Sequence, residues 1–140
     1  MDEPSLVRAG VPAHEARALV ARGLMPERVG HLEVVGAVKR DDDLVLAFDM
    51  DTPMVVRNGR VWAVYGDEVK LVNSSVCAFL DTLERYAQHV RAVLAVDTDE
   101  EEERQARVTQ QDFMAIDPAA FADDDAYWPV TCEDMIDGCL

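Results

Sequence analysis

Val72-Asn73-Ser74-Ser75-Val76 ends a predicted strand and begins a long predicted helix. The first backbone N–H groups of a helix have no partner within the helix, and short polar side chains accept hydrogen bonds from them. The Asn-Ser-Ser triplet supplies such side chains. From Val76 to Leu94 the apolar residues recur at three- and four-residue steps, which predicts one apolar stripe facing a core. We therefore interpret Asn73, Ser74 and Ser75 as a helix cap that identifies the fold, and not as catalytic groups.

Upstream of the triplet, short β-branched stretches alternate with turn residues and predict a meander of strands. Asn58-Gly59 is the strongest hairpin signal, because both residues tolerate a positive φ. Lys39 to Asp43 is too charged to bury and predicts a connecting loop. The predicted strands are Leu32–Val38, Leu44–Met50, Met54–Arg57, Arg60–Tyr65 and Val69–Val72.

Helices are predicted at both ends of the chain. Ala13 to Arg22 is rich in good helix formers and stops at Gly23. After the long helix, we expect a helix from about Glu102 to Ala115, a cap and first-turn proline at Asp117-Pro118, an acidic helix entry at Asp123 to Asp125, and a last helix from Trp128 to Ile136 stopped by Gly138. This order predicts one α+β domain over residues 1–140: an N-terminal helix, an antiparallel sheet of about five to six strands, and C-terminal helices packed on one face.

The charge of the chain is concentrated in its last third. The sequence has 28 acidic and 13 basic residues, a net charge of −15. Residues 1–96 hold 14 acidic and 11 basic residues, whereas residues 97–140 hold 14 acidic residues against Arg104 and Arg107, a net charge of −12. An acidic surface opposes contact with phosphate backbones and anionic lipid, and it favours basic partners. We expect no direct nucleic-acid ligand.

The cysteines and the N-terminus predict a cytoplasmic protein. Cys77, Cys132 and Cys139 are an odd set with no close pairing, which favours free thiols in a reducing compartment. Met1 to Pro4 is acidic and lacks the layout of a secretory signal, and no apolar run approaches the length that a bilayer needs. We expect no membrane association.

Asp49-Met50-Asp51 resembles the nucleophile motif of haloacid dehalogenase-type phosphatases, in which Asp49 would attack phosphorus and Asp51 would act as acid and base with Mg²⁺. The context does not favour this hydrolase alternative, since Thr52-Pro53 leads directly into the Asn-Gly hairpin and proline stands where that motif needs a hydroxyl.

Metal sites have equally little support. The three histidines form no i, i+4 pair, no Cys-x-x-Cys motif occurs, and calcium loops starting at Asp41 or Asp97 lack the required glycine and glutamate. We predict no catalytic residue, metal or cofactor.

Aromatic side chains are predicted to anchor the core. They are Trp62, Tyr65, Tyr86, Phe113, Phe121, Tyr127 and Trp128. Trp62 and Val64 alternate along a strand as core residues do. Trp128 follows the acidic Asp123–Asp125 segment, so an interface position is the alternative for it.

Three segments together resemble the SUKH superfamily, and within it the SUKH-4 group of immunity proteins. They are the hairpin Val55–Val64, the run Leu71–Ser75 with Phe79 and Leu80 on the next helix, and a tail with Ile116–Ala120, Trp128-Pro129 and Gly138. The resemblance implies the SUKH fold and a protein that neutralises a polymorphic toxin by binding it, commonly a nuclease or a nucleic-acid deaminase. It implies no enzymatic activity.

The resemblance supplies no binding motif, so we predict the partner-binding residues from charge and leave the oligomeric state open. They are Asp97, Asp99, Glu100, Glu101, Glu102, Glu103, Asp123, Asp124, Asp125 and, as an aromatic anchor, Trp128. The alternative to a toxin partner is an acidic, non-enzymatic scaffold or regulatory module that binds host proteins.

Overall fold

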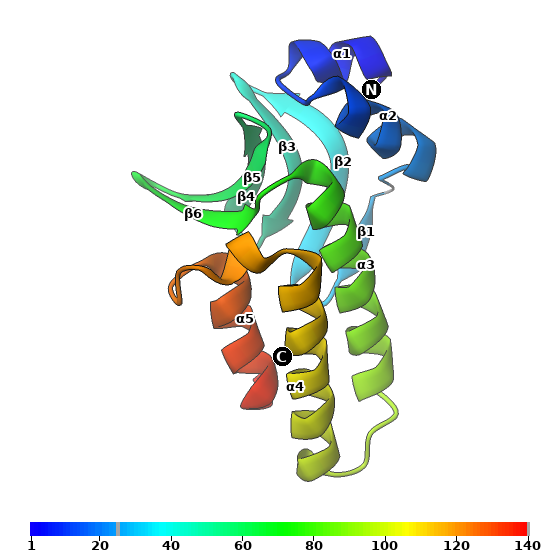
Figure 1. Cartoon of the computed structure of the whole chain (residues 1–140), viewed down its shortest axis with the longest axis vertical. Helices are drawn as coiled ribbons and strands as arrows, with labels where there is room; N and C mark the ends of the chain where they lie inside the picture. The colour runs from blue at the N-terminus through cyan, green and yellow to red at the C-terminus, as the bar shows by residue number, and fades with distance from the viewer. Residues whose placement is uncertain (25, 140) are drawn as a thin grey trace.

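The computed structural model describes residues 1–24 and 26–139, so Leu140, the end of the acidic third, lies outside the described residues. Figure 1 shows N-terminal helices, a curved sheet and a group of C-terminal helices. The elements are α1 (Glu3–Arg8), α2 (Ala13–Arg22), β1 (Glu27–Val29), β2 (Leu32–Arg40), β3 (Asp43–Asp49), β4 (Thr52–Arg57), β5 (Arg60–Tyr65), β6 (Glu68–Asn73), α3 (Val76–Val93), α4 (Asp99–Ile116), the 3₁₀ helix η1 (Pro118–Phe121) and α5 (Tyr127–Ile136).

The sheet is a six-stranded antiparallel meander in which neighbours in sequence are neighbours in space, from β1 to β6. This confirms the predicted α+β fold. The predicted loop from Lys39 to Asp43 is wrong at both ends: β2 continues through Arg40, and only Asp41 and Asp42 form the turn. Exposed strand ends keep charged side chains in water, so their charge does not exclude a strand. β1 and α1 are additional to the prediction.

The Asn58-Gly59 turn fixes the register of the central hairpin. Both residues have positive φ, 52° and 73°, as a type I′ turn requires. Val56 therefore pairs with Val61, and Val55 pairs with Trp62. This register decides which side chains of β5 face the helices.

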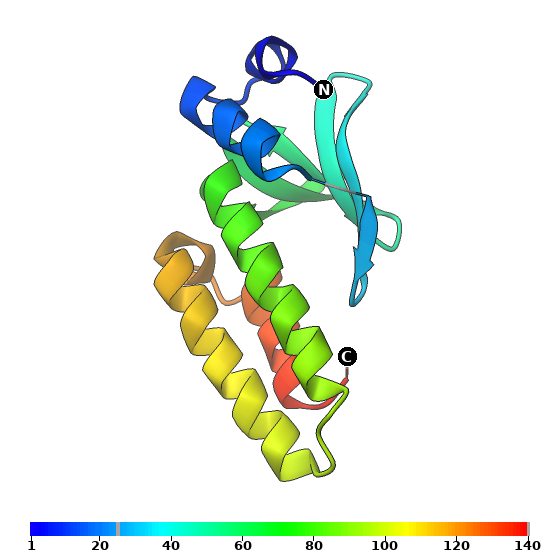
Figure 2. The same ribbon diagram turned by 90° about the vertical axis from the view of Figure 1, so that its right-hand side faces the viewer.

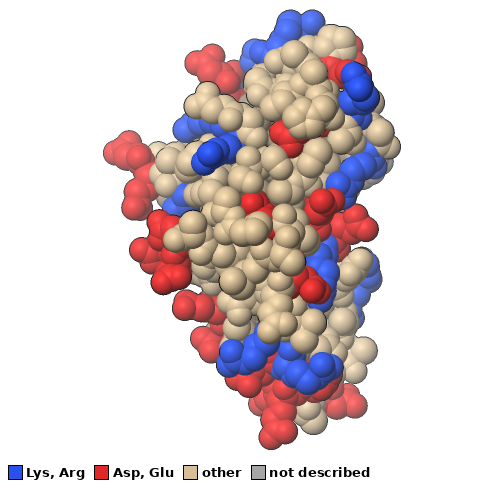
Figure 3. Space-filling model, viewed as in Figure 1, with Lys and Arg blue, Asp and Glu red and all other residues tan. Residues whose placement is uncertain are grey.

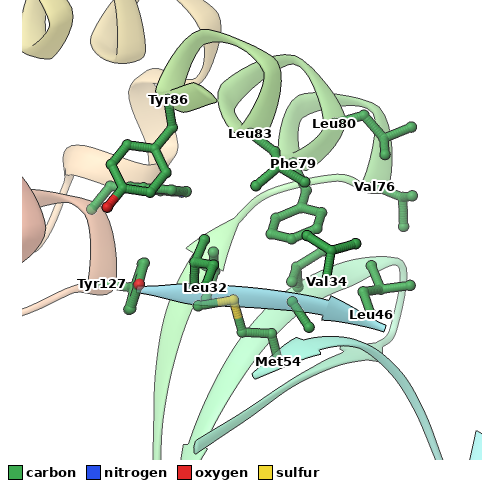
Figure 4. Packing of buried hydrophobic residues seen from close by; sticks show 14 of the residues in the cluster. Leu32, Val34, Leu46, Met54, Val76, Phe79, Leu80, Leu83, Tyr86 and Tyr127 are labelled. Carbon is green, nitrogen blue, oxygen red and sulfur yellow. The ribbon is translucent and has the colours of Figure 1, made fainter. Parts of the chain in front are cut away.

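One core joins the sheet to α3. In Figure 4, Phe79 and Leu83 of α3 point toward Val34 and Leu32, and Val76 lies above Leu46. The three α3 residues follow the three- and four-residue spacing that the sequence predicts. The predicted long helix is thus confirmed, and it covers the inner face of the sheet.

The helices α3, α4 and α5 lie side by side below the sheet (Figures 1 and 2). α4 begins at Asp99 and not near Glu102, because Thr98 accepts the Glu101 N–H with its Oγ1 at 3.2 Å and so caps the helix earlier. The acidic Asp123–Asp125 segment is a turn before α5 and not a helix entry, since the helix begins only at Tyr127.

Within residues 1–24 and 26–139, none of the helices combines the length and the apolar character that crossing a membrane requires.

Candidate functional site

The triplet that joins β6 to α3 contributes to a buried hydrogen-bond network. Asn73 is fully buried, and its amide nitrogen donates to Asp117 Oδ2 at 2.9 Å and to Thr82 Oγ1 at 3.2 Å. Its amide oxygen accepts from Trp128 Nε1 at 2.9 Å. Ser74 donates to the same Asp117 carboxylate from its backbone N–H and from its hydroxyl, both at 2.8 Å. We call these five residues the polar joint.

Only one member of the triplet is a helix cap. Ser75 accepts the Ala78 N–H with its Oγ at 3.0 Å, as predicted. The cap interpretation is wrong for Asn73 and Ser74, whose side chains instead tie β6 to Asp117 at the start of η1. The Asp117 carboxylate likewise does not cap η1, since it is occupied by the joint. Among the described residues, every buried side-chain polar atom has a hydrogen-bond partner.

Trp128 is fully buried, so the interface position considered for it is wrong. Its ring packs edge-to-face against Phe113, Tyr127 and Tyr86, with centroids 4.9, 5.0 and 5.5 Å away. Trp128 is therefore a core anchor that also completes the polar joint.

The Asp49-Met50-Asp51 string does not form the arrangement that a phosphatase needs. β3 leads into the antiparallel strand β4 through a tight turn, and not into a helix. Asp49 accepts a hydrogen bond from Tyr127 Oη at 2.9 Å, and burial together with this carboxylate raises the pKa of Tyr127. Asp51 is exposed in the turn. In the part of the chain that the structure describes, no three His, Cys, Asp or Glu side chains gather as a metal site.

The acidic residues at the start of α4 are partly neutralised within the helix. Arg104 binds both carboxylate oxygens of Glu101 and lowers the pKa of Glu101 to about 2. Arg107 lies 3.5 Å from Glu103. Acidic side chains in the first turn also stabilise α4, because they interact favourably with the positive end of its helix dipole. Part of this charge therefore serves the helix itself.

The second acidic segment, Asp123–Asp125, lies at the opposite end of α4. The 18 residues of α4 span about 27 Å at the usual helical rise. Figure 3 shows acidic groups along the left edge of the molecule and at its lower end. The structure thus places the predicted acidic residues on two separated segments and does not bring them into one cluster.

A groove separates β5 and β6 from the segment between η1 and α5. Its volume is about 340 Å³, and its lining includes Trp62, Val69, Leu71, Asp123 and Asp125. We call it the β6 groove. The core prediction for Trp62 is wrong: the indole is half-buried in this groove, where its Nε1 donates to the Arg57 carbonyl at 3.3 Å.

The burial of its two strand neighbours shows that Trp62 lies on the outer face of the sheet. Val61 and Ala63 are fully buried toward the helices, so Trp62 between them must face the other way. There it pairs with Val55 and Leu71. Tyr65, also predicted in the core, is 39% exposed. The alternation of side chains along β5 can be seen in the sequence, but it does not indicate which face of the sheet the helices cover.

The fold defines an α+β domain with an antiparallel meander and helices on one face. The chain matches the profile of the SUKH-4 immunity protein family over residues 1–134, and it therefore belongs to that family. This confirms the resemblance found in the sequence. Searches of curated proteins and of solved structures give no match.

Proposed function

We propose that this chain neutralises a cognate toxin of the nuclease or nucleic-acid deaminase type by binding it through its acidic surface. The family supports the immunity role. The observation that carries the finer proposal is the charge of residues 97–140, a net −12, with Asp97, Asp99, Glu100 and Asp123–Asp125 all exposed.

A toxin that acts on nucleic acid needs a basic surface to hold phosphates. An acidic protein surface complements such a face and accelerates association by electrostatic steering. Binding alone would then keep nucleic acid away from the toxin's substrate-binding surface, so the immunity protein needs no catalytic group of its own.

The test is co-expression with the toxin encoded by the adjacent gene. We expect rescue of growth and a stable complex on size exclusion, with an association rate that falls as salt rises. No complex and no rescue would overturn the proposal. Rescue of growth from a toxin that does not act on nucleic acid would support the immunity role but overturn the proposed class of toxin. Capture of host proteins without rescue would favour a regulatory module instead.

A further inference from the structure

β6 is the last strand of the sheet, so β5 pairs with it on one side only. Gly66 and Asp67 form a two-residue turn, so Tyr65 and Glu68 on either side of it are a hydrogen-bonded pair. Hydrogen-bonded pairs alternate along an antiparallel ladder. The N–H and C=O groups of Val69 and Leu71 therefore point away from β5, toward the free edge.

η1 and α5 contact part of β6, and the β6 groove separates them from Val69 and Leu71. η1 and α5 hold the far end of β6 through the polar joint at Asn73. Within residues 1–24 and 26–139, no hydrogen bond from outside the sheet reaches Val69 or Leu71. Val69 is 46% exposed. Such an edge is a template for strand addition.

The β6 groove beside this edge favours a basic side chain. It contains three carboxylates, of Glu68, Asp123 and Asp125, against one ammonium group, of Lys70, which lies over the Tyr65 ring at 5.9 Å. The apolar part of the groove is formed by Trp62, Leu71 and three alanines of the η1–α5 segment. A lysine or arginine can lay its aliphatic stem on an indole and place its charge among carboxylates.

We infer that an extended, basic segment of the toxin adds to the sheet as a seventh strand along Glu68–Leu71 and inserts a lysine or arginine into the β6 groove. This inference rests on the proposed function and specifies where the toxin binds. The backbone groups of Val69 and Leu71 form hydrogen bonds with the added strand, and the carboxylates of Asp123 and Asp125 favour a positively charged side chain in the groove.

The decisive variant is Val69→Pro, with Val69→Thr as its matched control. Proline removes the outward N–H but no β5–β6 ladder bond, and edge strands tolerate it. Threonine keeps the N–H and a β-branched side chain. With an inactivated form of the adjacent gene's toxin domain as probe, we expect Val69→Pro to weaken binding about tenfold or more and Val69→Thr to bind like wild type.

Hydrogen exchange on the wild-type complex tests the same contact without a mutation. The amides of Val69 and Leu71 should exchange slowly only when the toxin domain is bound, because they lack partners in the free protein. This measurement decides the question even if Val69→Pro does not fold.

Charge selection is tested with two matched pairs of substitutions. Asp123→Asn with Asp125→Asn should weaken binding about threefold or more and reduce its salt dependence, whereas Asp99→Asn with Glu100→Gln should have a smaller effect. The inference is overturned, and the proposed function retained, if the toxin domain binds but leaves Val69 and Leu71 unprotected, or if the Asp99/Glu100 pair is the more sensitive. A toxin domain that does not bind wild type overturns the proposed function itself.

Discussion

The polar joint and the free edge of β6 belong to the same strand, yet their polar groups have opposite environments. At Asn73 each side-chain polar atom is buried and paired. Four residues earlier, at Val69, the outward backbone groups have no partner from outside the sheet in the described part of the chain. A buried polar group without a hydrogen-bond partner destabilises the fold, whereas an exposed one can bind water until another chain pairs with it. The comparison predicts that changes in the joint affect stability, and changes at the edge affect binding.

The largest expected effect is that of Asp117→Ala. Its carboxylate accepts three hydrogen bonds, one from Asn73 and two from Ser74. Its loss leaves these donors with fewer partners at a site that is 3% exposed, so the free energy of unfolding should fall by about 3 kcal/mol. Urea denaturation measures this.

The matched control for Asp117→Ala is Asp124→Ala, the same change at an exposed carboxylate. It should alter the free energy of unfolding by less than about 0.5 kcal/mol. Equal losses in the two variants would remove the distinction between the joint and the exposed acidic segment.

A smaller loss of stability is expected from Ser75→Ala. This hydroxyl caps α3, and the loss of a cap costs about 1 kcal/mol. Toxin affinity should stay at the wild-type value, because Ser75 lies at the joint end of β6. Ser75→Asp, which keeps an acceptor at the cap, should restore most of the stability. Reduced binding by folded Ser75→Ala would instead assign the joint to the interface.

The difference between Ser75 and its two neighbours shows what the sequence could predict. A cap depends on residues within one turn of the helix, so Ser75 was predictable, as was the Asn58-Gly59 hairpin. The contact of Asn73 with Asp117 joins residues 44 positions apart and depends on how η1 returns to the sheet. β1, with three residues, is too short to give a periodic signal. The β6 groove needs both the face of Trp62 and the position of the η1–α5 segment, which only the tertiary fold supplies.

At the acidic segment beside the edge, the expected change in stability is smaller still. Asp123→Asn combined with Asp125→Asn keeps the side-chain oxygen that accepts the Asp125 N–H at 2.9 Å. The free energy of unfolding should therefore change by less than about 0.5 kcal/mol, although binding to the toxin domain weakens. Thermal melting monitored by circular dichroism provides the comparison. A large drop in melting temperature would mean that these carboxylates support the fold.

The smallest effect is expected at the other acidic segment, where the pair Arg104 and Glu101 tests whether exposed charge stabilises this protein at all. The hydrogen bonds from Arg104 are the main cause of the low Glu101 pKa, followed by the one from Gln105. Arg104→Ala should raise the pKa of Glu101 from about 2 toward its ordinary value of 4.5, as NMR titration of the carboxyl would show. Arg107→Ala, one turn further along, should leave it low.

The low pKa of Glu101 also makes its contribution to stability depend on pH. Because the pKa of Glu101 is lower in the folded state, its contribution to stability is present above pH 4.5 and is lost as pH falls toward 2. Solvent screens an exposed pair, so this contribution should be much smaller than that of the polar joint. If the Glu101 pKa stayed near 2 in Arg104→Ala, the positive end of the α4 dipole would be its main cause. The acidic residues of α4 would then act mainly on their own helix, which strengthens the assignment of partner recognition to the edge of β6.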